Sequence, residues 1–337
     1  MKEALTRHSY YWLLLLYFLP LAAALAAAPL VGAERIDALG AIKSLFGGGA
    51  ANIDFSILFS QRIPRVLLAA LAGGTLAAVG ACFQAILHNP LAEPYTLGVT
   101  GGSTMGATLA IVVPGLHFSW GPFSTVQLFS LLGAAAALIF LYALSRRPEG
   151  IAAPTLLLAG ITVSIVSAGF ILFMRYAASP EFLIQMDRWL MGGLEIGGFE
   201  ELTALFPFLL PGLYMLFSCR LEMNHLSVGE ELAAGHGVDV GSVQKKIFFG
   251  GGLTTAAVVS LSGPIGFVGL IVPHAVRRLS GYDHRIALPG CFFLGGAFLV
   301  ACDAAARTLF SPREMPVGII TALIGGPVFI WILLKKR

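Results

Sequence analysis

Residues 224–239 read NHLSVGEELAAGHGVD, a segment of small, acidic and polar residues in a chain that otherwise consists largely of apolar runs. Such runs flank it on both sides, and an apolar run of about 20 residues can cross a bilayer as a helix. We therefore expect residues 224–239 to lie in water at one face of a membrane and to form a short helical element. A small exposed element in this position predicts a docking surface for a partner protein.

The composition predicts an integral membrane protein. Of 337 residues, 57% are hydrophobic and 12% are charged, which is far less polar than a water-soluble domain. Forty glycines and 18 prolines in so apolar a chain are typical of closely packed and broken membrane helices. The net charge of +3 does not indicate nucleic-acid binding, because the basic residues lie mostly between apolar runs, where they orient the spans.

The four cysteines predict neither a metal site nor redox chemistry. Cys82, Cys219, Cys291 and Cys302 lie within or at the ends of apolar segments, without C-x-x-C spacing and without histidines at ligand spacing. We interpret them as small buried apolar side chains.

Ten apolar segments are candidate transmembrane helices. They are centred in residues 10–31, 64–86, 95–114, 123–144, 152–174, 200–219, 246–263, 266–279, 286–305 and 316–334. The eighth is short and interrupted by glycine and proline, so its boundary with the seventh is the least defined. The first exceeds the apolar region of a typical cleaved signal peptide, so we expect it to be retained. The expected fold is an all-α membrane protein with a single transmembrane domain over residues 1–337.

The basic residues predict the orientation of the spans. A cytoplasmic N-terminus places most of the 21 lysines and arginines on the cytoplasmic side, as the positive-inside rule requires. Both termini are then cytoplasmic, and so is the loop 220–245 that contains the polar segment. Residues 32–63 form an outer loop, in which apolar residues from Ile36 to Phe46 recur at helical spacing and predict an interfacial helix.

Two stretches, about residues 64–175 and 246–334, resemble each other in outline. Each begins with a glycine cluster, and each carries an apolar turn rich in glycine and proline. Because each holds four spans and a single span separates them, the two halves would run in opposite directions, as an inverted repeat.

Small residues recur every four positions in three spans. The positions are Gly98, Gly102 and Gly106; Gly160, Ser164 and Ala168; and Gly318, Ala322 and Gly326. Such ladders let helix backbones approach closely, so packing within the chain is one interpretation. The other is that the fifth and tenth spans, with Ser164, Ser167 and Thr321 as a mildly polar stripe, line a passage between two copies of the chain.

Three common catalytic motifs do not occur in this chain. It contains no G-x-x-x-x-G-K-[ST] phosphate loop, no G-x-S-x-G and no H-E-x-x-H, so we expect no ATPase, hydrolase or metalloprotease site. Ionisable residues within the spans are few, chiefly Asp303 and Arg307. Ion-coupled carriers usually place carboxylates near the midplane, so an external energy source is favoured. An ion-coupled secondary transporter is the alternative, and a membrane-embedded enzyme lacks the clustered ionisable residues it would need.

Four sequence motifs occur in a fixed order. They are QRIPR at 61–65, GACFQAILHNPLAEP at 80–94 followed by Leu97-Gly98, GPIGFVGLIVPH at 263–274, and MPVGIITALIGGPVFIW at 315–331. With them the chain resembles, over nearly all of its length after residue 55, the FecCD-type permease family of ABC importers for vitamin B12, iron-siderophores and haem. Gln61 and Met315 stand where this family commonly has leucine, which does not disturb the assignment.

The resemblance implies an architecture and a set of partners. It implies the type II ABC importer permease fold in the inner (cytoplasmic) membrane, with two copies of the chain in a homodimer. Two cytosolic ATPase subunits would bind ATP and Mg and hydrolyse ATP, so this chain would be no enzyme and would hold no cofactor. A substrate-binding protein would dock from outside. The cargo would be a metal chelate, with an iron-siderophore favoured and haem or cobalamin left open.

The resemblance also assigns roles to particular residues. The loop between the sixth and seventh spans forms the coupling helices in this family. The ATPase contacts it implies are Asn224, Leu226, Gly229, Glu230, Glu231, Ala233, Ala234 and Gly235. Arginines at the matching motif positions pair with glutamates of the binding protein, which implies docking by Arg62, Arg65 and Arg307; their alternative is interfacial anchoring. The translocation pathway along the dimer axis would include Gly160, Ser164, Ser167, Ala168 and Thr321.

Overall fold

The computed structural model describes residues 7–32, 34, 36–37, 40–41, 53–113, 115–116, 118–148 and 150–334 of the chain. Almost all of this part is helical, and its strands are two pairs of two residues each. The interfacial helix expected between Ile36 and Phe46 falls largely outside the described residues, as do the two ends of the chain that we expect to be cytoplasmic.

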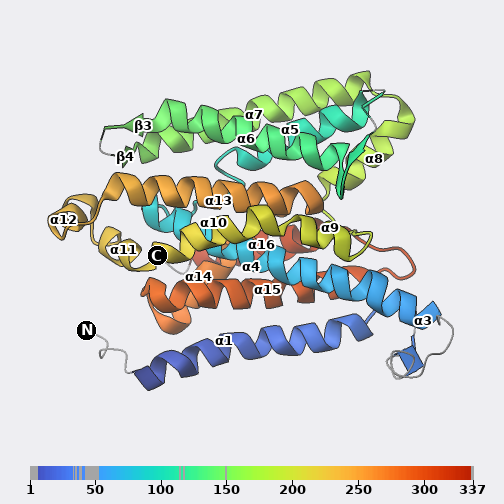
Figure 1. Cartoon of the computed structure of the whole chain (residues 1–337), viewed down its shortest axis with the longest axis horizontal. Helices are drawn as coiled ribbons and strands as arrows, with labels where there is room; N and C mark the ends of the chain where they lie inside the picture. The colour runs from blue at the N-terminus through green and yellow to red at the C-terminus, as the bar shows by residue number, and fades with distance from the viewer. Residues whose placement is uncertain are drawn as a thin grey trace.

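Each of the ten predicted spans coincides with a helix of the structure, with boundaries that differ by a few residues (Figure 1). These helices are α1 (Arg7–Ala27), α4 (Ile63–Ile86), α5 (Val99–Val112), α6 (Thr125–Ser145), α7 (Ala153–Ala177), α10 (Phe206–Ser218), α13 (Val240–Ser262), α14 (Val268–Ser280), α15 (His284–Thr308) and α16 (Val317–Leu334). Five helical stretches of the described chain are both long enough and apolar enough to cross a membrane. The chain is therefore an all-α membrane protein.

Short elements join the long helices. They are η1 (Ala28–Leu30), α3 (Ile53–Ser56), η2 (Ile57–Arg62), β1 (Ser119–Trp120), β2 (Phe123–Ser124), β3 (Arg146–Arg147), β4 (Gly150–Ile151), α8 (Pro180–Leu190), α9 (Phe199–Ala204), α11 (Arg220–Leu226) and α12 (Glu230–Gly235). In Figure 1, α11 and α12 lie at one end of the bundle and α8 and α9 at the other. We call these the α12 end and the α8 end.

Polar side chains set where several helices begin. Before α6, the Ser124 side chain accepts a hydrogen bond from the Gln127 backbone while the Gln127 side chain accepts one from the Ser124 backbone, a capping box. Asp239 caps α13 by accepting a hydrogen bond from the Ser242 backbone nitrogen at 2.9 Å. These caps fix the start of each helix at the water-exposed ends of the bundle.

Glycines allow α4 to approach two other helices closely. A Cβ on Gly80 would overlap the carbonyl oxygen of Gly269 on α14, and a Cβ on Gly73 would overlap that of Gly295 on α15. Backbone contact of this kind is the packing mode expected in lipid, where apolar burial alone does not draw helices together.

The ladder of small residues on α5 is used in the same way. A Cβ on Gly102 would lie 2.6 Å from the Gly133 carbonyl oxygen on α6, and a Cβ on Gly98 would lie 2.8 Å from the Gly160 carbonyl oxygen on α7. Gly106 packs against the Phe129 carbonyl of α6. The α5 ladder therefore packs against α6 and α7 within the chain.

The two halves of the chain show the expected inverted repeat. The helices α4 to α7 contain 24, 14, 21 and 25 residues, and α13 to α16 contain 23, 13, 25 and 18. The second helix of each half is the shortest and begins after a left-handed residue, Gly98 (φ 78°) or Phe267 (φ 69°). The chain enters α13 from the α12 end, whereas α4 finishes there, with His88 Nε2 2.9 Å from the Leu226 carbonyl oxygen of α11.

Candidate functional site

Three contacts within the chain hold α11 and α12 on the bundle. The Asn224 side chain donates to Asp283 Oδ1 at 2.9 Å and accepts from the His284 backbone nitrogen at 2.8 Å, which fixes α11 to the start of α15. Leu226 and Ala233 are each 1% exposed and belong to the hydrophobic core. Hydrogen bonds from Arg285, assisted by Asn224, lower the pKa of Asp283 to about 2, so this anchor stays ionised at neutral pH.

The outward side of α12 presents apolar and acidic side chains together. Val228 and Leu232 are 69% and 55% exposed. We define the α12 surface by its exposed residues Val228, Glu230, Glu231, Leu232, Ala234 and Gly235. Glu230 accepts a hydrogen bond from Gln244 Nε2 at 2.9 Å, and Gln244 Oε1 accepts one from the Ile151 nitrogen, so α12 is also tied to α13 and β4.

The structure sorts the eight coupling residues predicted from sequence into two groups. Glu230, Glu231, Ala234 and Gly235 are exposed, and Gly229, half-buried at φ 131°, makes the turn before α12. Asn224, Leu226 and Ala233 point into their own chain. Leu226 and Ala233 therefore position the surface from within their own chain, and the role of the eight residues in coupling stays a prediction. Val228 and Leu232 were missed, although two apolar residues four apart in a polar segment are a readable signal of one exposed helical face.

A cluster of charged side chains lies at the α8 end. Arg65 contacts Asp303 Oδ1 at 3.0 Å and Glu314 Oε2 at 2.6 Å. Arg307 forms an ion pair with the other Asp303 oxygen, also at 3.0 Å. The Asp303 side chain is 0% exposed, so it is a buried anion held between two guanidinium groups. Arginine suits this role better than lysine because its guanidinium is permanently charged and carries several N–H donors that can bind different acceptors at once.

The same cluster ties down the chain that follows α1. Arg307 donates to the carbonyl oxygens of Val31 and Ala28 at 2.9 and 3.2 Å. Arg62 donates to the carbonyl oxygens of Pro29 and Glu34 at 3.1 and 2.6 Å. These hydrogen bonds connect the end of α1 to the start of α4 and the end of α15.

The three arginines make their contacts within the chain. Arg62 and Arg307 are 7% and 3% exposed, and the Arg65 side chain is 15% exposed. Their heads bind backbone carbonyls and carboxylates of the same chain, so interfacial anchoring with the head in water does not describe them. Docking of a binding protein on these arginines stays a prediction.

The predicted pathway residues are also largely packed within the chain. Gly160 lies against the backbone of Leu97, and Ser167, 3% exposed, lies against Gly101 of α5. Thr321 is fully buried and donates to the Gly318 carbonyl oxygen at 3.1 Å. Ser164 is half-buried and Ala168 is exposed. A passage along α7 would therefore be lined by the Ala168 side of the helix rather than by Ser167.

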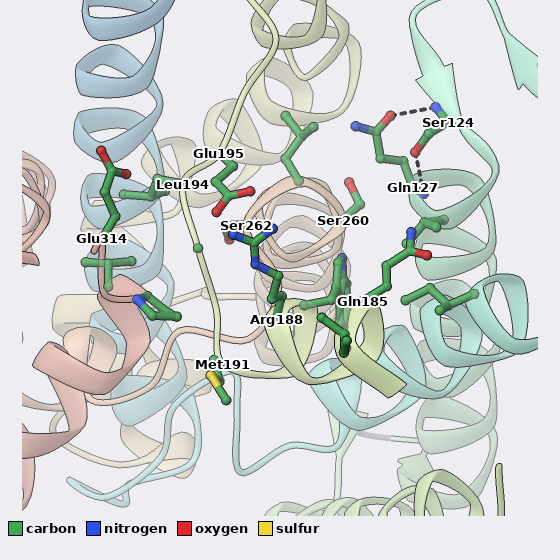
Figure 2. Close-up of a pocket in the computed structure, with 18 of the residues that line it drawn as sticks. Ser124, Gln127, Gln185, Arg188, Met191, Leu194, Glu195, Ser260, Ser262 and Glu314 are labelled. Carbon is green, nitrogen blue, oxygen red and sulfur yellow. Dashed lines mark hydrogen bonds between the residues drawn. The ribbon is translucent and has the colours of Figure 1, made fainter. Parts of the chain in front are cut away.

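A cavity of about 850 Å³ opens at the α8 end, between α8, the start of α6, the end of α13 and the residues before α16. Figure 2 shows Arg188 and Glu195 projecting into it beside Ser262. The sequence reasoning did not predict α8 or this cavity. A signal for α8 is present, because Ser179-Pro180-Glu181 is a typical helix start and Arg188 stands in the last turn.

No group of three or more His, Cys, Asp or Glu side chains that could hold a metal ion occurs in the part of the chain that the structure describes.

Comparison with known proteins places this geometry in context. Residues 19–335 match the model of the FecCD transport family. The cobalamin import system permease protein BtuC of Halobacterium salinarum is 40% identical over 281 residues, 83% of this chain and 74% of that protein. The hemin transport system permease protein HmuU of Yersinia pestis is 34% identical over 311 residues, 91% of this chain and 92% of that protein. A solved ABC transporter described as metal-chelate type, in an inward-facing conformation, superposes with a TM-score of 0.81 at 30% identity, covering 98% of this chain and all of that one.

Proposed function

The chain belongs to the FecCD transport family, and we propose that it is the membrane-spanning permease of an ATP-driven ABC importer that carries a metal chelate across the inner membrane. Residues 1–337 would form one permease domain with both termini in the cytoplasm. The observation that carries the proposal is the α12 surface. It is a compact exposed element, rigidly tied to α13, α15 and β4, and it lies at the opposite end of the bundle from the cavity.

The α12 surface has the properties that a motor contact requires. Val228 and Leu232 offer apolar area, Ala234 and Gly235 allow close approach, and Glu231 offers an anion to basic groups. Because the anchors behind it are buried, a push on α12 would move α13 and α15 rather than bend a loop. Two cytosolic ATPase subunits, one per copy of this chain, would supply that push by hydrolysing ATP with Mg, so no cofactor would reside in this chain and ATP hydrolysis would take place in the partner.

The remaining partners follow from the family. A second copy of the chain would complete the transport pathway, and a substrate-binding protein would deliver cargo at the α8 end. The relatives named for cobalamin and hemin support a metal chelate as cargo. We favour an iron chelate of the siderophore type, with haem and cobalamin as the other candidates.

An ion-coupled secondary transporter is the alternative mechanism. It would need a buried carboxylate that is free to bind an ion. Asp303 is buried, but Arg65 and Arg307 already neutralise it, which supports a structural role.

Uptake in proteoliposomes tests the proposal. The permease is reconstituted with its ATPase and binding protein, and radiolabelled ferric chelate is supplied on the binding-protein side. We expect accumulation that needs ATP and Mg on the ATPase side and that survives an uncoupler. Uptake that persists without ATP and collapses with the uncoupler would instead establish the secondary-transporter mechanism.

A variant of the α12 surface links the transport to the contact. Ala234→Arg places a bulky cation on the exposed face, so we expect uptake to fall to background while the protein remains monodisperse. Ala234→Ser adds a single hydroxyl group and should retain most uptake. Full uptake by Ala234→Arg would show that the motor binds elsewhere.

A further inference from the structure

The cavity at the α8 end has the size and position of a ligand site. Its volume of about 850 Å³ lies within the range of about 300–1,000 Å³ that is usual for small-molecule pockets. Its wall includes Met315, Pro316 and Val317, the residues that lead into α16. A molecule in the cavity would therefore lie beside the start of α16.

Backbone contacts fix the wall of the cavity. The Gly193 nitrogen donates to the Ser262 carbonyl oxygen at 2.8 Å, and the Gly318 nitrogen donates to the Gly192 carbonyl oxygen at 3.1 Å. These two bonds hold the segment after α8 against the end of α13 and the start of α16. On α8 itself, Met186 is fully buried against Ile111, so the helix is held from its other side as well. The cavity is preformed rather than dependent on a ligand to order it.

The unpaired charged side chains that line the cavity are more often negative than positive. Five charged side chains line it: Arg65, Glu181, Arg188, Glu195 and Glu314. Arg65 already forms ion pairs with Asp303 and Glu314. Glu181, Arg188 and Glu195 make no ion pair with any other residue that the structure describes, which leaves two carboxylates against one guanidinium.

The uncharged part of the lining adds hydrogen-bonding and apolar area. Gln127 and Gln185 supply amides that both donate and accept, and Ser260 supplies a hydroxyl. Trp189, Ile184 and Leu194 supply apolar surface beside them. A cleft lined by an excess of one sign of charge focuses its own field, so it disfavours a ligand of the same sign.

We propose that this cavity receives the metal chelate on its way to the pathway, and that it selects neutral or cationic chelates with amide-rich and apolar outer faces over polyanionic ones. The proposal rests on the proposed function, which it narrows to one charge class of cargo. Selection here works by repulsion of the wrong cargo as well as by contacts to the right one.

Direct binding tests this selection without the partner proteins. The full chain in lipid nanodiscs is titrated with three soluble ferric chelates: a neutral tris-hydroxamate, a tris-hydroxamate with a protonated amine, and a tris-catecholate of three negative charges. Trp189, one of four tryptophans, lines the cavity, so iron bound there quenches its fluorescence. We expect the two hydroxamates to bind at least about tenfold more tightly than the tris-catecholate, equivalent to about 1.4 kcal/mol. Trp189→Phe should remove the signal.

Two charge reversals form a matched pair. Glu195→Lys makes the cavity net positive, so we expect the preference for the hydroxamates to shrink to about threefold or less, or to invert. Glu200→Lys makes the same change on a residue of α9 that does not line the cavity, and the preference should stay within about twofold of the wild-type value, because a charge outside the lining acts on the chelate only through screening solvent.

The outcomes separate this inference from the proposed function. Equal affinity for all three chelates, no quenching of Trp189, or an equal effect of Glu195→Lys and Glu200→Lys would overturn the selection. ATP-driven uptake without charge preference would leave the function standing and the inference refuted. Charge-selective binding without ATP-driven uptake would support the selection of chelates by charge and refute the proposed ATP-driven import.

Discussion

Asp303 is fully buried between two arginines that come from different helices, Arg65 of α4 and Arg307 of α15. Removing its charge leaves two buried cations short of a partner. Breaking a buried ion pair in this way costs about 3–5 kcal/mol, more than most single changes. Asp303→Asn should therefore strongly lower the thermal stability of the purified protein, measured by size-exclusion chromatography after heating.

An exposed ion pair at the same end is the control. Asp187 bonds Arg175, but their side chains are 33% and 46% exposed. Exposed pairs contribute about 0–1 kcal/mol, so Asp187→Asn should shift the melting temperature only slightly. Equal shifts for the two variants would mean that the Asp303 cluster does not hold the α8 end together.

The close crossings between helices depend on glycine. Gly80→Ala would place a Cβ on the Gly269 carbonyl of α14, where the overlapped atom is backbone and cannot rotate away. Overpacking of this kind typically costs about 1–3 kcal/mol or more. We expect little monodisperse protein after extraction from the membrane.

Gly169→Ala provides the comparison for this crossing. Gly169 lies in α7, where a Cβ added to it would have no neighbouring atom within 4 Å, and alanine favours helix over glycine. This variant should match or exceed the wild-type yield. Equal losses for both variants would show that glycine content, rather than the α4–α14 crossing, sets stability.

The elements differ in how far sequence could predict them. The ten spans were predictable because hydrophobic length is a local property, and each of these segments is helical in the structure. The arginine cluster was not, because Arg65 and Asp303 lie 238 positions apart and only the fold brings them together. The sequence identified the segment that contains α12, but not which of its side chains face outward. Burial of Leu226 and Ala233 depends on packing against α13 and α15, which is not a local property of the sequence.

The whole molecule has two chemically different ends, and its orientation in the membrane can be tested directly. Ser227, at the α12 end, and Glu200, at the α8 end, are both exposed in the structure and can each be replaced by a single cysteine. The four native cysteines are buried and can be replaced beforehand by alanine. An impermeant maleimide should label Glu200→Cys from outside intact cells and Ser227→Cys only in opened membranes. Labelling of both from the same side would refute the proposed topology.

A second copy of the chain has an identifiable place to bind. The outward side of α7 carries Ile165 (67% exposed), Ala168 and Leu172 (66% exposed), and α6 carries an equally apolar side at Ile139 (65% exposed). Lipid could cover either, but a small residue distinguishes α7, because Ala168 between Ile165 and Leu172 lets another backbone approach. If two copies meet across the pathway at α7, Ala168→Cys should form an intermolecular disulfide with mild oxidant in native membranes, while Ile139→Cys on the lipid side should not. Cross-linking of Ile139→Cys alone would move the interface to α6 and remove α7 from the pathway.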